Sequence, residues 1–177
     1  ELGHAISYLD DRKDIEDSLL AEIIFGNCIN TSSIEQKCKQ MGNDPGMLEQ
    51  VFVLNLCKKS SEETCNELNQ GITNDKIRNY AQTLKEYFAE CDYPAIISCY
   101  GDRIIGFIKD CTDDCRKIIE IFEQFGEFLQ NDLNGIEYTL NIGEKCESIS
   151  KLQKSFHETS KTNSVLEHIN RKNEIIF

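Results

Sequence analysis

Residues 91–115 read CDYPAIISCYGDRIIGFIKDCTDDC and hold four of the nine cysteines of the chain. Pro94 suits the first turn of a helix, because proline has no N–H group to leave unpaired there. After it, the side chains of Ile97, Tyr100, Ile104 and Ile108 fall on one face at helical spacing. The stretch therefore predicts a buried helix that begins at Pro94, with Gly101 as a kink in its middle.

The segments on both sides of this stretch predict further helices. Thr112 is an N-cap residue for the helix that follows, with Asp113 and Asp114 in its first turn. Asp44 and Pro45 form a similar start, and the residues after them are apolar on all sides, which is typical of a fully buried helix. The helix after Pro45 covers residues 47–59, and other helical patterns cover residues 8–27, 32–41 (capped by Ser32 or Ser33), 60–71, 74–91, 115–129 and 146–156.

These patterns predict an all-α fold, a disulfide-stapled bundle of about seven to nine helices. The small numbers of glycine (10) and proline (2) also favour helices over a many-turned β fold. Residues 131–143 are the least helical and predict a short strand or an extended loop. We expect one helical domain over residues 1–177, and part of the polar segment 160–177 to be a mobile tail.

The chain is acidic, with a formal net charge of −12. Such a surface repels nucleic-acid phosphates and anionic lipid headgroups, so we expect no nucleic-acid partner. No run of residues reaches the roughly 18 apolar positions of a membrane-spanning helix, so we expect no membrane insertion.

The cysteine content indicates an oxidising compartment. Nine cysteines in 177 residues, and a chain that starts at Glu1 as after removal of a signal peptide, predict a secreted, extracellular protein. The sequon at Asn30 is a glycosylation candidate for that compartment. All nine are disulfide candidates, in pairings that the sequence leaves open: Cys28, Cys38, Cys57, Cys65, Cys91, Cys99, Cys111, Cys115 and Cys146.

An odd number of cysteines leaves at least one thiol free, modified or bound to another chain. A bond between Cys111 and Cys115 would distort the first turn of the helix expected there, so we expect each to bond to a different helix. The chain has no CxxC pair, so we expect no zinc site.

No pattern in the sequence indicates catalysis. His157 opens a segment that begins like HExxH, but Lys161 stands where the second metal ligand is required. The chain has no GxSxG, GxGxxG or P-loop motif. We therefore expect no enzymatic activity, no catalytic residue, no metal and no cofactor.

Aromatic residues are dense between positions 80 and 128. They could fill a core, or they could line an apolar cavity for a small hydrophobic ligand, and the sequence leaves both readings open. The candidates for lining such a cavity are Tyr80, Tyr87, Phe88, Tyr100, Phe107, Phe122 and Phe125.

Three segments resemble the insect haemolymph glycoprotein family of small secreted helical proteins. They are SCYGDRIIGFI with the DDC that follows it, KCKQMGNDPG at 37–46, and GEKC at 143–146 with SKLQ at 150–153. The segments are in the family's order and span residues 37–155. Ser155 stands where the family has a cysteine, which would explain the odd count.

A weaker resemblance joins Cys91, Tyr93 and Cys99 to one Cys-Tyr-Cys motif of the bicycle effectors that gall-forming aphids secrete. Those proteins carry two such motifs, and this chain has one. The resemblances imply an insect haemolymph protein, or a salivary or gall effector, that binds an unknown protein partner. The alternative is an extracellular carrier of a small hydrophobic ligand.

Overall fold

The computed structural model describes residues 2–26, 30–58, 72–111, 115–131, 136–168 and 174–176. Together these residues form a mixed α/β fold with five α-helices and a five-stranded sheet. The elements in chain order are α1 (Leu2–Phe25), α2 (Thr31–Gln40), a 3-10 turn (Pro45–Met47), β1 (Gln50–Lys58), α3 (Asn74–Glu90), β2 (Ala95–Tyr100), β3 (Arg103–Ile108), α4 (Arg116–Asn131), β4 (Ile136–Ile142), α5 (Ile149–His168) and β5 (Glu174–Ile176).

The predicted all-α bundle of seven to nine helices is therefore wrong. The two segments expected to be the most buried helices are strands: β1, and the hairpin formed by β2 and β3. Gly101 has φ 60° and lies in the two-residue turn of that hairpin, where a positive φ at the first central residue is required, instead of kinking a helix. The predictions over 8–27, 32–41 and 74–91 are confirmed as α1, α2 and α3.

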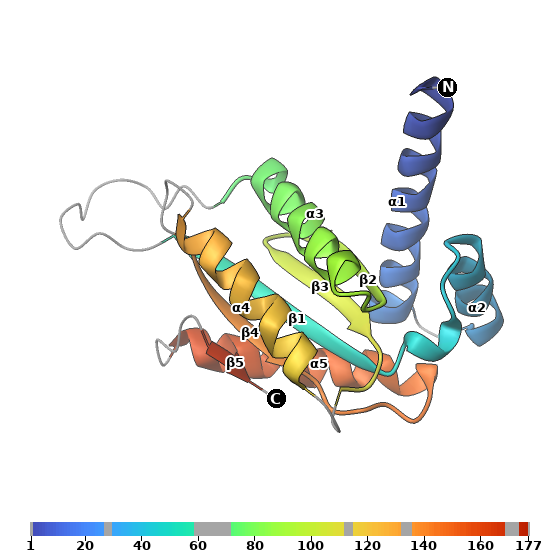
Figure 1. Ribbon diagram of the computed structural model, residues 1–177. Helices are drawn as coiled ribbons and strands as arrows, with labels where there is room; N and C mark the ends of the chain where they lie inside the picture. The colour runs from blue at the N-terminus through green and yellow to red at the C-terminus, as the bar shows by residue number, and fades with distance from the viewer. Residues whose placement is uncertain are drawn as a thin grey trace.

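The sheet has the strand order β2-β3-β1-β4-β5 and lies between two layers of helices (Figure 1). Helices α3 and α4 cover one face, while α1, α2 and α5 cover the other. The side chains of β1 point alternately to the two helical layers. Phe52 and Leu54 pack against α3 and α4, whereas Val51 and Val53 pack against α1, α2 and α5. Neighbouring strands are antiparallel except β4 and β5, which are parallel.

The described parts of residues 131–143 and 160–177, predicted as a strand or loop and as a partly mobile tail, belong to helices and strands for most of their length. Residues 136–142 form β4, so of the two alternatives predicted for this segment, a short strand or an extended loop, the strand is the one found there. Residues 160–168 continue α5, and residues 174–176 pair with β4 as β5. The segment 60–71, predicted to be helical, lies outside the described residues.

Candidate functional site

A groove of about 1000 Å³ runs along the outer edge of β2. Its two walls are helices α1 and α3, which stand on either side of β2 in Figure 1. Its floor includes Ala95, Ile97 and Cys99 from the strand itself. The groove exists because β2 is the terminal strand of the sheet, so that, among the described residues, no strand lies beside one side of its backbone.

The register of the hairpin shows which backbone groups face the groove. Tyr100 pairs with Arg103 across the two-residue turn, and residues that flank such a turn form a hydrogen-bonded pair. Hydrogen-bonded pairs alternate along an antiparallel ladder, so Ala95, Ile97 and Cys99 direct their N–H and C=O groups away from β3. All three residues line the groove, together with Ser98.

An ion pair links the two walls of the groove. The ammonium of Lys85 on α3 donates to Oε2 of Glu16 on α1, and Nε of Arg12 lies 3.6 Å from Oε1 of the same carboxylate. Glu16 is only 5% exposed. The two cations offset the cost of burying a carboxylate at that depth.

A second polar contact ties α1 to β2. The Ser98 hydroxyl donates to Oδ1 of Asp17, and Ser98 is buried. The neighbouring thiol of Cys99 donates to the carbonyl oxygen of Ile77 at 3.7 Å. Burial raises the pKa of Cys99 to about 11, which keeps the thiol protonated and unreactive at neutral pH. No histidine is among the described residues that line the groove, so the site lacks a base that titrates near neutrality.

The groove is electrically polarised along its length. Helix α3 leads into β2 through a short turn, so the two run in opposite directions, and Arg78 lies beside the Cys99 end while Glu86 lies beside the Ala95 end. Lys13 acts on the Cys99 thiol together with Arg78, which places it at the same end. Asp92, in the turn before β2, adds negative charge at the opposite end.

A smaller aromatic pocket of about 380 Å³ adjoins the groove at the hairpin turn. The rings of Phe25 and Tyr100 meet there with centroids 4.7 Å apart, although each residue remains about half exposed, at 49% and 52%. Phe156 and His157 of α5 complete the wall. Gly101 lines both the pocket and the groove, so the two lie next to each other at the hairpin turn.

The predicted ligand-lining aromatics do not gather around one cavity. Tyr80, Tyr87, Phe88, Phe122 and Phe125 pack with one another and with Phe52 in the layer between the sheet and α3 and α4, whereas Phe107 belongs to the opposite layer and Tyr100 to the surface. Phe88 and Phe122 meet edge to face at 5.7 Å, the geometry of a packed core. Phe88 lines the groove, and Tyr100 lines the aromatic pocket.

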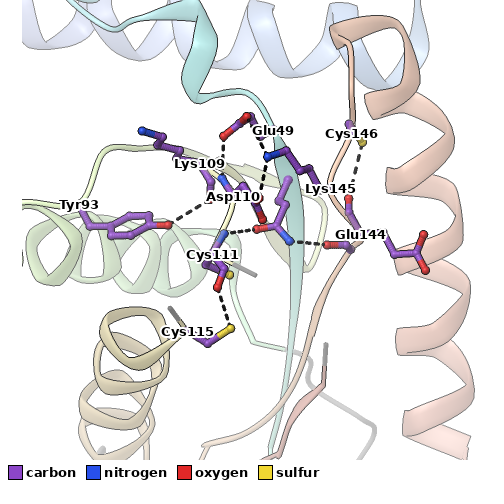
Figure 2. A network of polar contacts seen from close by, with 11 residues as sticks. Glu49, Tyr93, Lys109, Asp110, Cys111, Cys115, Glu144, Lys145 and Cys146 are labelled. Atoms are coloured by element: carbon purple, nitrogen blue, oxygen red, sulfur yellow. Dashed lines mark hydrogen bonds and ion pairs between the residues drawn. The ribbon is translucent and has the colours of Figure 1, made fainter. Parts of the chain in front are cut away.

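A separate polar network fastens the ends of three strands (Figure 2). The Lys145 ammonium lies between two carboxylates, at 2.8 Å from Asp110 and 3.6 Å from Glu49. The side chain of Gln50 accepts from the N–H of Cys111 at 2.8 Å and donates to the carbonyl oxygen of Gly143 at 3.1 Å. These contacts hold the start of β1 against the segments after β3 and β4, which is a structural role.

The cysteines give a mixed outcome. Seven cysteines form no disulfide in the part of the chain that the structure describes, while Cys28 and Cys65 lie outside it. The seven are Cys38, Cys57, Cys91, Cys99, Cys111, Cys115 and Cys146. The thiol of Cys115 donates to the carbonyl oxygen of Cys111 at 2.8 Å (Figure 2). Cys115 directly precedes the first residue of α4. Residues 112–114, where the helical turn that argued against a Cys111–Cys115 bond was expected, lie outside the described residues.

Burial raises the pKa of two of these thiols, Cys111 and Cys146. Burial and the neighbouring thiol of Cys115 raise the pKa of Cys111 to about 12. Cys146 is buried, and burial raises its pKa despite a hydrogen bond with Ser155, the residue that stands for a cysteine in the resemblance.

Asn30 has a structural part that the sequence did not reveal. Its Oδ1 accepts from the N–H of Ser33 at 3.3 Å, so Asn30 is the N-cap of α2, and the predicted cap at Ser32 or Ser33 is wrong. The side chain is exposed, and its amide nitrogen is the atom to which a glycan is attached.

The predicted absences were checked against the described residues. Among these, no group of three or more His, Cys, Asp or Glu side chains is arranged to hold a metal ion. None of the described helices combines the length and apolar character that a membrane span requires.

Comparison with known proteins gave no matching family model and no matching curated sequence. The two resemblances drawn from the sequence therefore stay predictions. Sequence reasoning did not find the groove, because it expected β2 to be part of a helix, and because Glu16, Lys85 and Ser98 come together only in the folded chain. The hydrophobic run of residues 95–100 was the one signal that could have indicated a strand.

Proposed function

We propose that the protein acts without catalysis, by binding a partner protein that lays an extended segment along the outer edge of β2. The observation that carries this proposal is the groove itself: a strand edge with outward-facing N–H and C=O groups, between two helical walls. An added strand would displace the Lys85–Glu16 ion pair that joins these walls in the free protein. Addition of a strand to an exposed sheet edge is a common mode of peptide recognition, in which main-chain hydrogen bonds supply affinity.

The chemistry of the groove supports binding over catalysis. Its buried carboxylate, Glu16, is already paired with two cations, its serine hydroxyl is already donated to Asp17, and its thiol remains protonated. Each group therefore has a structural partner instead of a free proton or lone pair for a reaction. The cysteine content supports the further proposal that binding takes place outside the cell, as for an insect haemolymph protein or secreted effector.

The test is a selection of peptides from a displayed library of random dodecapeptides. We expect the library to yield binders, and we expect Ala89→Arg, which fills the groove from an exposed position on α3, to abolish their binding. Ala21→Arg is the matched control, because Ala21 is an exposed residue of α1 that does not line the groove. Failure to enrich any peptide, or equal loss with both variants, would contradict the proposal.

Amide hydrogen exchange tests the geometry directly. In the free protein, the amides of Ile97 and Cys99 should exchange faster than those of Ile96 and Ser98, which the ladder to β3 protects. Binding of a recovered peptide should slow exchange at Ile97 and Cys99. Binding without that protection would mean that the peptide contacts the protein elsewhere.

A further inference from the structure

We infer that the segment bound at β2 carries an acidic side chain beside the Cys99 end of the strand and, just beyond it, an aromatic side chain that enters the pocket at the hairpin turn. This inference rests on the proposed function and specifies the chemistry of the partner. It follows from two features of the groove that are not required for main-chain hydrogen bonding to β2. One is the difference in charge between its two ends, and the other is the aromatic pocket beside it.

The charge polarity indicates the acidic residue. The formal net charge of the protein is −12, yet the Cys99 end of the groove carries two cations, Lys13 and Arg78, against one carboxylate, Asp17, which accepts a hydrogen bond from Ser98. Arg78 has only an exposed contact to Asp75 at 3.7 Å, and Lys13 is itself exposed. A carboxylate of the bound segment would find here a local positive site on a surface that is otherwise negative, which gives orientation as well as attraction.

The aromatic pocket indicates the second side chain. Phe25 and Tyr100 are two of the three large hydrophobic residues that are exposed among the described residues, and their rings are in contact. Tyr100 ends the strand whose edge forms the groove, and Gly101 lines both cavities. A chain that follows β2 toward the turn therefore passes the basic end and reaches the pocket within a few residues.

An aromatic occupant fits this pocket better than an aliphatic one. The half-exposed, tilted pair of Phe25 and Tyr100 presents ring faces and edges to whatever enters, in a pocket that Phe156, His157 and the polar residues Asp102, Arg103 and Ser160 also line. Aromatic rings gain from such faces and edges beyond the area they bury, and aromatic anchors in pockets dominate many protein interfaces.

The experiment uses synthetic copies of the dodecapeptides recovered from the random library. We expect the recovered sequences to share an acidic residue and an aromatic residue a few positions apart. Replacement of the aromatic residue by alanine should weaken binding about tenfold, and replacement of the acidic residue by its neutral amide should weaken it about threefold, with the latter effect lost at high salt.

Variants of the protein locate the two contacts. In Phe25→Ala and Tyr100→Thr, the aromatic and alanine peptides should bind alike, whereas Val165→Ala, at the third exposed large hydrophobic residue, should keep the tenfold difference. In Arg78→Gln, the acidic peptide and its amide should bind alike. Both pocket residues are about half exposed, so we expect both variants to fold. If one of them does not fold, the other still tests the contact.

The outcomes separate the inference from the proposed function. Peptides that protect the Ile97 and Cys99 amides but tolerate loss of the aromatic residue, or bind the pocket variants normally, would overturn the inference and leave strand addition intact. Peptides that bind the aromatic pocket without protecting those amides would overturn both.

Discussion

The close approach of β1 to β3 makes Gly106→Ala a severe substitution. Gly106 lies opposite Phe52 in the register of these strands. A Cβ atom at position 106 would stand 2.2 Å from both Cε1 and Cζ of the Phe52 ring. Carbon atoms pack at about 3.5–4.0 Å, so the ring would have to move by more than about 1 Å.

The surroundings of Phe52 decide how much this movement costs. The ring is fully buried, stacked on Phe88 at 6.0 Å and in edge contact with Phe122 at 5.2 Å. Overpacking of a core costs about 1–3 kcal/mol, and weakening two aromatic contacts adds about 0.5–1.5 kcal/mol each. We therefore expect Gly106→Ala to lower the free energy of unfolding by about 3–5 kcal/mol, a large part of the stability of an ordinary domain.

Urea denaturation followed by far-UV circular dichroism measures this loss. Gly46→Ala is the control, because its nearest neighbour, Oδ1 of Asp44, is at an ordinary 3.4 Å, and we expect a change within about 0.5 kcal/mol. Phe52→Leu should relieve the clash, so that the double variant loses at least about 1 kcal/mol less than the sum of the two single losses. A loss below about 1 kcal/mol for Gly106→Ala, or strict additivity, would refute the packing argument.

Three further predictions concern the ion pair and the cysteines. Lys85→Met leaves the buried carboxylate of Glu16 with one weaker partner, so urea denaturation should show a loss of about 2–3 kcal/mol, and adding Glu16→Gln should restore most of it. In the reduced protein, Cys111 has a folded pKa of about 12 against 9.0 when unfolded, so its stabilising contribution is complete below pH 9 and is lost as the pH rises toward 12. Denaturation at a series of pH values should show that loss, and Cys111→Ala should make it smaller. After oxidation with glutathione disulfide, peptide mapping should find a bond between Cys111 and Cys115, and a bond from either to another described cysteine would contradict the structure.

Local sequence patterns were sufficient to predict an element where it has one buried and one exposed face. Helix α3 shows this best, because Ile77, Tyr80 and Leu84 recur at helical spacing against a polar background, and the predicted helix 74–91 is confirmed as Asn74–Glu90. The Asp44–Pro45 start was also predicted from local chemistry, since Asp44 caps the short turn through the N–H of Gly46. The helix expected to continue from it was not found, because β1 follows.

The sequence analysis predicted helices where β1, β2 and β3 are found, and there is a physical reason for this error. Both faces of β1 and β3 are covered by helices, so their sequences are mostly apolar on both faces and lack the alternation of a half-exposed strand. Such a run cannot be distinguished from a buried helix by periodicity alone. The β-branched and aromatic content of Ile104, Ile105 and Phe107 was the remaining signal, and the helical reading overrode it.

The candidate site depended on tertiary structure almost entirely. The sequence by itself determined the acidic charge, the cysteine content, and most of the helices, because these follow from composition and from contacts within a few residues. Only the folded chain placed β2 at an edge and brought Glu16 to Lys85, and Phe25 to Tyr100, across some 70 residues of sequence. Strand pairing and ion pairs over such separations are set by how the layers pack, and no local pattern encodes that packing.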